Sequence, residues 1–324
     1  MGDGRAPLRA LAKGSGRGHI ASTLIRALPF ILLALCAGIR ISERYFCPDL
    51  RVDFLDVGQG DAALIRFPGD EAWLVDAGDA SPHRRADIFL ELARRGILHL
   101  DAAVLSHPDL DHIGGFEGLA GNISIGLFYY HAATPPADHP VFARLAAILA
   151  PSVARWEAVA SPRAIHRGGV RATLTPLRAG KSKNNQPLVL SLEFAGCRFL
   201  LAGDAERRAE AQWAARRPGA VHVLKANHHG SRTSSSNIFL RELEPRWTVI
   251  SSGTGNRYGH PAREVLERLL PQTEVLRTDF EGEVSFTVTP GGSLRCRSTR
   301  GPCGQTECGL PVADKVDRGL EDEA

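Results

Sequence analysis

The feature that most constrains this chain is a run of metal-ligand residues directly after a short apolar strand. The strand is expected at residues 101–106, "DAAVLS", and "SHPDLDHIGG" covers residues 106–115. The ligand types in this run are His107, Asp109, Asp111 and His112. Loops at strand ends present side chains on a backbone that the sheet holds in place. Because crowded imidazoles and carboxylates without a cation are a poor arrangement of charges, the run predicts a metal site on a β-sheet scaffold.

Apolar segments on both sides of this run predict two β-sheets with helices outside. Strands are expected at residues 51–57, 62–67, 72–78, 170–177, 188–196, 197–204, 221–227, 247–253, 274–279 and 283–289, and helices at 86–96, 205–217, 236–245 and 261–270. The first helix should end at Gly96, a residue typical of helix C-termini. No linker rich in proline or serine interrupts this pattern, so we interpret residues 48–295 as one hydrolase domain.

The amino-acid composition excludes few classes of function. Hydrophobic residues make up 44% of the 324 residues and charged residues 23%, which is typical of a globular protein with a sizeable core. The formal net charge of +3 is compatible with a polyanionic substrate but does not select one.

Residues 1–47 differ from the rest of the chain in composition. A basic, glycine-rich stretch precedes the uncharged apolar run "ALPFILLALCAGI" at residues 27–39. This order is typical of an export signal or an N-terminal membrane anchor. A spanning helix needs about 20 apolar residues, and residues 24–41 reach a marginal length only by including two arginines. The alternative is a buried helix of the domain. We expect attachment through residues 24–41 or export, with the catalytic domain outside the cytoplasm.

The C-terminal end contains three of the six cysteines, Cys296, Cys303 and Cys308. No two of the six are spaced closely enough for a zinc ribbon. A disulfide among the three could form outside the cytoplasm, although three cysteines cannot all pair with one another. Because residues 296–324 have little apolar periodicity, they are predicted to be a disordered tail.

Three further segments place ligand residue types near strand or helix ends. Asp204 closes the strand in "FLLAGD", where a carboxylate can bridge two cations. His228 and His229 follow a strand in "ANHHGS", and His260 precedes a helix in "NRYGHP". Each pattern also has a structural explanation: a common turn, a solvated turn and a packing or capping histidine, respectively.

Residues 50 to 290 resemble the metallo-β-lactamase-like domain of the ComEC family of DNA-uptake proteins. The stretches that carry the resemblance are "FLDVGQGDAALI", "LVDAG", "SHPDLDHIGG", "NNQPLVLSL", "FLLAGDAE", "LKANHHGSRTSSS", "SSGTGNRYGHP" and "RTDFEGEVSFT". The resemblance implies an α/β fold, an αββα sandwich of two mixed β-sheets flanked by helices. It also implies a metal site at one edge and a metal-dependent nuclease activity. Hydrolases of lactams, thioesters, RNA and phosphodiesters share this superfamily, so the fold alone does not give the substrate.

Two features depart from the family pattern. Full-length members carry many membrane-spanning segments, whereas this chain has at most one and could not form a DNA channel. Pro187 in "NNQPLVL" stands where the family has serine, which puts a local backbone or hydroxyl contact in doubt but no metal ligand.

The resemblance implies two metal positions with Asp204 as a bridge. The first would use His107, Asp109 and the Asn185 amide, and the second Asp111, His112 and His229. Asp109 replaces a histidine of the superfamily's all-histidine motif. Oxygen ligands suit manganese or magnesium, whereas imidazole favours zinc. We therefore expect two divalent cations, manganese or zinc with magnesium as a third candidate, and interpret Asp109 as an altered metal preference.

The expected chemistry is attack by a metal-activated water. Two cations about 4 Å apart lower the pKa of a bridging water and neutralise charge on a phosphodiester. Asp204 and Asp111 would fix the metals, and His228 would donate a hydrogen bond to the phosphate or a proton to the leaving oxygen. Candidate residues lining the site are Asp56, Gln59, Asp61, Asp76, Asn185, Ser231 and His260. Asp76 is expected to support the site more than to bind a metal.

Three functions remain open at this stage. The leading one is a DNA nuclease, the second is a hydrolase of small phosphodiesters such as choline-phosphate or lipid headgroups, and the third is a non-enzymatic DNA-binding module. A DNA enzyme should have a basic groove, whose candidate residues are Arg207, Arg208, Arg232, Arg257 and Arg263. Solvated helix and loop surface is the alternative for these arginines. No protein partner is expected.

Overall fold

The computed structural model describes residues 47–79, 87–180 and 182–309. The chain divides into two units, Met1–Cys47 and Pro48–Ala324, and the fold described below belongs to the second. The expected export or anchor segment, including residues 24–41, lies outside the described residues. Among the described residues, no helix combines the length and apolar character needed to cross a membrane.

The first β-sheet has nine strands in the order β16-β15-β14-β1-β2-β3-β4-β5-β6. Their bounds are β1 (Leu50–Phe54), β2 (Ala63–Arg66), β3 (Ala72–Val75), β4 (His99–Val104), β5 (Ser124–His131), β6 (Val153–Val159), β14 (Val284–Val288), β15 (Ser293–Ser298) and β16 (Gly301–Glu307). Strands β3 to β6 pair in parallel, and the other neighbours are antiparallel. The sheet is therefore mixed.

The second sheet has seven strands in the order β13-β12-β11-β10-β9-β8-β7. Their bounds are β7 (Arg163–Arg167), β8 (Val170–Pro176), β9 (Leu188–Phe194), β10 (Cys197–Leu201), β11 (Val223–Lys225), β12 (Trp247–Ile250) and β13 (Glu274–Arg277). Strands β10 to β13 are parallel, and β7 to β10 are antiparallel. This sheet is also mixed, with its parallel half toward the later part of the chain.

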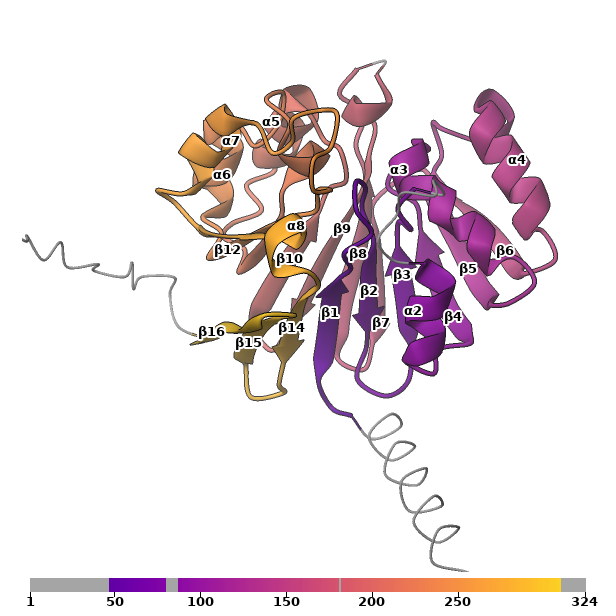
Figure 1. Cartoon of the computed structure of the whole chain (residues 1–324), viewed down its shortest axis with the longest axis horizontal. Coiled ribbons are helices and arrows are strands. Elements are labelled where there is room, and N and C mark those ends of the chain that lie inside the picture. Colours follow the sequence, from indigo (N-terminus) through magenta and orange to yellow (C-terminus); the bar gives the residue numbers. More distant parts are fainter. Residues whose placement is uncertain (1–46, 80–86, 181, 310–324) are drawn as a thin grey trace, which may run out of the picture. The chain divides into compact units, whose positions relative to one another are not determined.

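Helices cover the outer faces of both sheets (Figure 1). The α-helices are α2 (Ile88–Arg94), α3 (Leu110–Ile113), α4 (Pro140–Leu149), α5 (Arg207–Ala214), α6 (Asn237–Leu243), α7 (Arg263–Leu269) and α8 (Thr278–Glu281). The 3-10 helices are η1 (Gly114–Leu119), η2 (Pro136–Asp138), η3 (Lys183–Asn185) and η4 (Asn227–Gly230). Residues of α2, η1 and α4 pack on the first sheet, and residues of α5, α6 and α7 pack on the second.

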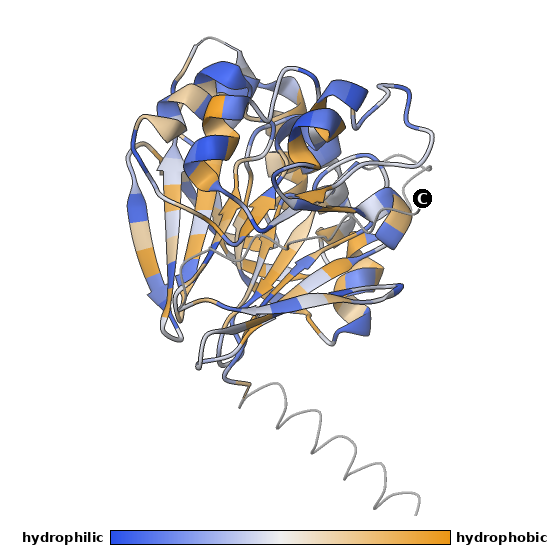
Figure 2. Cartoon of the chain, turned by 90° about the vertical axis from the view of Figure 1, so that its left-hand side faces the viewer, coloured by the Kyte–Doolittle hydropathy of each residue, from blue (hydrophilic) through white to orange (hydrophobic). Residues whose placement is uncertain are grey.

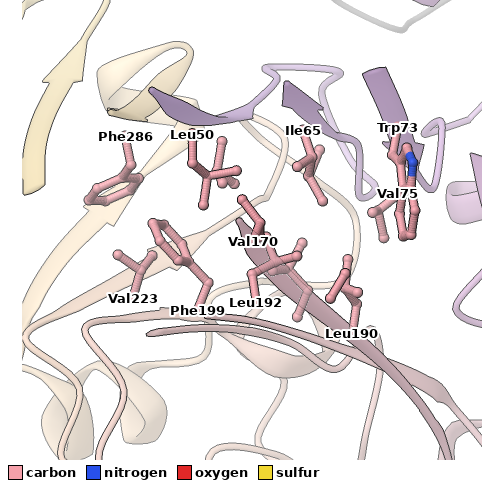
Figure 3. Close-up of a cluster of buried hydrophobic side chains, with 14 of the residues drawn as sticks. Leu50, Ile65, Trp73, Val75, Val170, Leu190, Leu192, Phe199, Val223 and Phe286 are labelled. Atoms are coloured by element: carbon pink, nitrogen blue, oxygen red, sulfur yellow. The ribbon is translucent and has the colours of Figure 1, made fainter. Parts of the chain in front are cut away.

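The apolar side chains form three layers. One lies between the two sheets, and one lies between each sheet and its helices. Successive strand residues point to opposite faces, so Ile65 belongs to the core between the sheets while Leu64 packs under the helices of the first sheet. In the second sheet Phe199 and Leu200 divide in the same way. Side chains from the two sheets point toward one another in Figure 3, and Figure 2 shows apolar residues concentrated on the strands. The predicted αββα sandwich is confirmed.

The structure contradicts the predicted disordered tail for residues 296–309. This segment completes β15 and forms β16, a pair of strands added to the edge of the first sheet. Leu294 and Cys296 alternate inward on β15 and are buried, whereas most of β16 is exposed. The prediction was wrong because an exposed edge strand such as β16 has few buried positions and therefore shows little alternation of apolar residues. Residues 310–324 lie outside the described residues.

Two disulfides stabilise this C-terminal hairpin, one within it and one that links it to the rest of the domain. Cys296 pairs with Cys303 across the hairpin, and Cys308 pairs with Cys197 at the start of β10. The three C-terminal cysteines therefore do not pair only among themselves, because the third finds its partner 111 residues earlier in the chain. A disulfide that closes so long a loop lowers the conformational entropy of the unfolded chain and thereby stabilises the folded domain.

Candidate metal centre

Parallel strands of both sheets end at one edge of the sandwich, and polar residues follow each strand. Asp76 comes after β3 and His107 after β4 in the first sheet. Asp204 comes after β10 and the pair His228 and His229 after β11 in the second sheet. Because the carboxyl ends of parallel strands meet at one edge, residues far apart in the sequence converge there.

Asp204 lies at the centre of the converging side chains. Its Oδ1 atom lies 3.1 Å from His112 Nε2 and 3.4 Å from His229 Nε2. Its Oδ2 atom lies 3.7 Å from His107 Nε2 and 3.5 Å from His228 Nε2. Each carboxylate oxygen thus faces a different pair of imidazoles. This is the arrangement expected of a carboxylate that bridges two cations.

Several buried atoms of this cluster make no hydrogen bond of good geometry among the described residues, although their neighbours in the cluster lie within 4 Å. They are the Nε2 atoms of His107, His112 and His229 and the Oδ1 atom of Asp204. Orphaned buried polar atoms are uncommon in folded proteins. Ligand atoms of His107, His112 and Asp204 all lie within 4.8 Å of one another, as do those of Asp111, His112 and His229. The donor set and its unmet lone pairs fit divalent metal ions.

The two aspartates of the "SHPDLDHIGG" segment extend this set. Asp109 Oδ2 lies 3.4 Å from His107 Nε2, and Asp111 Oδ2 lies 3.2 Å from His229 Nε2. Asp109 occupies the N-cap position of α3, yet its side chain makes no capping hydrogen bond. Its carboxylate is turned to His107 instead. Asp109 thus lies beside His107, and Asp111 lies beside His229.

Groups behind two of the histidines fix their ring orientation. His112 Nδ1 lies 2.8 Å from Asp76 Oδ2, and Asp76 also accepts hydrogen bonds from the backbone N–H and the hydroxyl of Ser106. His229 Nδ1 donates to the Ser251 carbonyl at 3.0 Å, since a carbonyl can only accept. The Nε2 atom of His229 therefore points into the cluster. Such outer hydrogen bonds are typical of metal-ligating histidines.

Asp61 and Lys225 complete the inner wall behind His229. Asp61 Oδ1 lies 3.1 Å from His229 Nδ1 and 2.8 Å from Lys225 Nζ. All three side chains are buried. Sequence analysis placed Asp61 only as a lining residue and missed Lys225. A lysine within the apolar strand "VHVLKAN" is the signal that could have found it, because a buried lysine needs an acidic partner.

The carboxylates dominate the electrostatics of the cluster. Burial lowers the pKa of His229, but Asp204, Asp61 and Asp111 outweigh this effect and raise it to about 10. Burial likewise opposes the charge on His112, and Asp204 and Asp76 raise its pKa well above the usual value. The carboxylates thus favour the protonated, positively charged form of both imidazoles. A divalent cation competes with those protons for the same lone pairs.

The backbone at the site adopts conformations that only a rigid scaffold maintains. Asp76, His228 and His229 have φ of 54°, 50° and 54°, in the left-handed region. Such residues cost about 1–3 kcal/mol each and cluster at functional sites. Gly203 precedes Asp204 with φ of 52°, and a Cβ there would lie 2.6 Å from Ser106 Oγ. Glycine therefore allows the end of β10 to approach the loop after β4.

The predicted role of Asn185 as a metal ligand is wrong. Its Nδ2 atom donates to Glu206 Oε2 at 3.2 Å, and its Oδ1 atom accepts from the Ala209 N–H at 3.2 Å. Both ends of the amide are used to join η3 to the start of α5. Asn185 therefore positions Glu206, which in turn lies beside His228.

The other predicted lining residues shape loops around the cluster. Asp56 Oδ1 accepts from the Gly58 N–H within its turn at 3.3 Å. Gln59 Oε1 accepts from the Gly253 N–H at 3.2 Å, which joins the turn at residues 58–61 to the loop after β12. Ser231 Oγ lies 3.1 Å from Thr233 Oγ1, within the loop that follows His229.

His228 and His260 lie on the open side of the cluster. The His228 side chain is 22% exposed, whereas those of His107, His112 and His229 are almost fully buried. The ring of His260 stacks on His229 with centroids 6.3 Å apart. Burial, together with His229 and His228, lowers the pKa of His260 to about 4. A pKa this low favours the neutral form of the His260 imidazole at neutral pH.

Glu210 anchors the loop that carries His228 and His229, and the sequence analysis did not identify it. This buried side chain accepts hydrogen bonds from Asn227 Nδ2 at 2.9 Å and from the Ser236 N–H at 2.8 Å. It thereby holds the loop on both sides of His228 and His229. Its position on the inner face of α5 was the available signal, since buried glutamates are almost always paired.

Comparisons with known proteins agree with this geometry. Residues 55–253 match the family model described as "Metallo-beta-lactamase superfamily". The chain is 32% identical over 262 residues to "ComE operon protein 3" of Bacillus subtilis, covering 72% of this chain and 32% of that protein. It is also 32% identical over 244 residues to "Competence protein ComA" of Neisseria gonorrhoeae, covering 73% of this chain and 32% of that protein. The chain thus spans about a third of the length of these curated relatives.

A solved structure shows the same fold. The diiron beta-hydroxylase CmlA of Streptomyces venezuelae aligns with a TM-score of 0.50 at 12% identity, covering 74% of this chain and 54% of that one. The similarity to competence proteins confirms the resemblance to the ComEC family, which the motifs had indicated. The family model covers more than half of the chain. The chain therefore belongs to the metallo-beta-lactamase superfamily.

Proposed function

We propose that this member of a hydrolase superfamily cleaves DNA phosphodiester bonds with two divalent cations. The observation that carries the proposal is the Asp204 carboxylate, whose two oxygens face two separate sets of buried ligands. The similarity to competence proteins supports DNA as the substrate. The basic character of the chain is consistent with a polyanion.

The ligands divide into two groups around Asp204. His107 and Asp109 would hold the first cation, and Asp111, His112 and His229 the second. When bound, two such cations activate a water and neutralise charge on a phosphoryl group. We propose manganese as the preferred metal because the aspartates add hard oxygen ligands, with zinc and magnesium as the competitors.

The chain's own residues on the open side would handle the leaving group. His228 is the most exposed of the four imidazoles around Asp204. Its Nδ1 atom lies 3.8 Å from Glu206 Oε1 and 3.5 Å from Thr233 Oγ1. These groups orient the ring so that Nε2 faces the Asp204 side. In this position His228 can donate a hydrogen bond to a phosphate oxygen or a proton to the leaving oxygen.

The proposed export of the catalytic domain has independent support. One disulfide closes the C-terminal hairpin and a second joins it to β10, and disulfides persist mainly in oxidising compartments. Together with the basic and apolar pattern of residues 1–47, this supports a location outside the cytoplasm, exported or attached to a membrane through residues 24–41.

The first prediction tests the reaction. Residues 48–309 should cut labelled DNA and hydrolyse a chromogenic phosphodiester when given manganese, zinc or magnesium. Asp111→Ala should abolish both activities, because it removes a direct ligand. Asp76→Asn should lower them by about 10- to 100-fold, the usual cost of losing a group that orients a ligand. Circular dichroism should show an intact fold in both variants.

The outcomes separate the competing functions. Hydrolysis of the small diester without DNA cleavage would favour a small-phosphodiester hydrolase. DNA binding with neither reaction, under all three metals, would favour a non-enzymatic binding module. Full activity of Asp111→Ala at matched metal occupancy would refute the site assignment.

The second prediction concerns Asp109. The wild-type enzyme should work better with manganese than with zinc, and Asp109→His should shift the preference toward zinc, since imidazole is the softer ligand. Asp109→Ala should weaken the first position and spare the second. Activity titrations with each metal rank the preferences. An identical metal ranking in wild type and Asp109→His would mean that Asp109 does not touch the metal.

The third prediction concerns location. A reporter fused after residue 50 should appear outside the cytoplasm or in the membrane fraction, because the N-terminal segment directs export or attachment. A matched fusion that lacks residues 24–41 should stay in the cytoplasm. A full-length fusion that is wholly soluble and cytoplasmic would contradict the proposal.

A further inference from the structure

An open pocket rich in arginine lies beside the metal centre. Its volume is about 570 Å³. The residues that line it are Asn185, Glu206, Arg207, Arg208, Arg232, Thr233, Glu264 and Arg268. They come from the loop before β9, the start of α5, the loop after His229 and helix α7. Four arginines therefore face two glutamates within one hollow.

The pocket carries more positive than negative charge, with four arginines and two glutamates in its lining. In the described part of the chain, none of its four guanidinium groups forms an ion pair with a carboxylate. Arg207 donates to the Arg232 carbonyl at 3.2 Å, and Arg268 donates to the Ser234 and Ser235 carbonyls. By contrast, Arg263 just outside the pocket pairs with Glu267 at 2.7 Å.

The carboxylate closest to the metal centre accepts its hydrogen bonds from neutral groups and not from these arginines. Glu206 Oε2 accepts from Asn185 Nδ2 at 3.2 Å, and Glu206 Oε1 accepts from the Thr233 hydroxyl at 3.3 Å. The arginines Arg208 and Arg232 are exposed. Their guanidinium groups are therefore available to an anion that enters from solvent.

The pocket opens next to the residue that we place at the leaving group. Glu206 Oε1 lies 3.8 Å and Thr233 Oγ1 3.5 Å from His228 Nδ1, while His228 Nε2 lies 3.5 Å from Asp204. The imidazole of His228 thus separates the metal ligands on one side from the arginine pocket on the other. A molecule cut at the metal centre would extend past His228 into the pocket.

We infer that this pocket binds a backbone phosphate of the substrate strand, next to the bond that is cut. Guanidinium groups bind phosphate oxygens through paired charge-assisted hydrogen bonds. A small phosphodiester has a single phosphate, which the metal centre uses, so only a polymer can fill the second position. The inference rests on the proposed function and deepens it, because it explains a preference for nucleic acid over small diesters.

The test compares a pocket variant with a matched control. The pocket variant is Arg208→Ala with Arg232→Ala, and the control is Arg144→Ala, which removes an exposed arginine paired with Glu117 on a distant helix. All proteins are loaded with manganese. Binding of a fluorescent single-stranded oligonucleotide is followed by anisotropy at several salt concentrations, with Asp111→Ala added to every protein so that the strand is not cut. Hydrolysis of bis(p-nitrophenyl) phosphate is measured in parallel without that substitution.

The pocket variant should bind the oligonucleotide at least about tenfold more weakly, since each charge-assisted hydrogen bond contributes on that order. Its salt dependence should also become shallower by about one unit for a lost phosphate contact. Hydrolysis of the small diester should stay within about twofold of wild type in both variants.

Two results would overturn the inference. One is oligonucleotide binding as tight and as salt-dependent in the pocket variant as in the Arg144→Ala control. The other is an equal loss of small-diester hydrolysis, which would mean that the arginines act on the metal centre itself. Failure of the proposed function is distinguishable, because wild type would then hydrolyse neither substrate while the binding measurement still reports on the pocket.

Discussion

The buried carboxylate of Asp204 is the constraint on which the rest of the structure depends. A buried ion is costly unless positive groups and hydrogen bonds compensate it, and four imidazoles from two loops surround this one. The sandwich brings them together because β4, β10 and β11 end at the same edge. Left-handed backbone at Asp76, His228 and His229 directs the side chains inward. The cluster is therefore a product of the sheets as much as of its own residues.

The centre has a closed side and an open side, and each suits a different task. Behind the histidines, Asp76, Asp61 and Lys225 are buried and hydrogen-bonded, which fixes ring orientation. In front, His228 is partly exposed and borders the arginine pocket. A rigid inner wall holds ligands, whereas a solvated cationic face admits a polyanion. This division is consistent with the proposed cleavage of DNA.

Much of the site could be predicted because its ligands follow strands. Strand periodicity located β4, β10 and β11, and the residue types after them identified His107, Asp204 and His229. The sequence could not show where an amide points, so Asn185 was placed on the metal although it joins η3 to α5. The pairing of Lys225 with Asp61 could not be predicted either, because it depends on which strands are neighbours of the cluster in the fold. The C-terminal hairpin was missed because β16 is exposed and its Cys308 pairs with a distant residue.

Counting bound metals by native mass spectrometry tests the central claim most directly, namely that Asp204 joins two cation positions. The wild-type domain supplied with manganese should carry two cations per chain. Asp204→Ala should carry at most one, because both ligand groups lose the oxygen that faces them. A shift in melting temperature with added metal should follow the same order, since ligands that bind the folded state stabilise it. A wild-type domain that binds no cation, or an Asp204→Ala variant that binds two as tightly, would contradict the account.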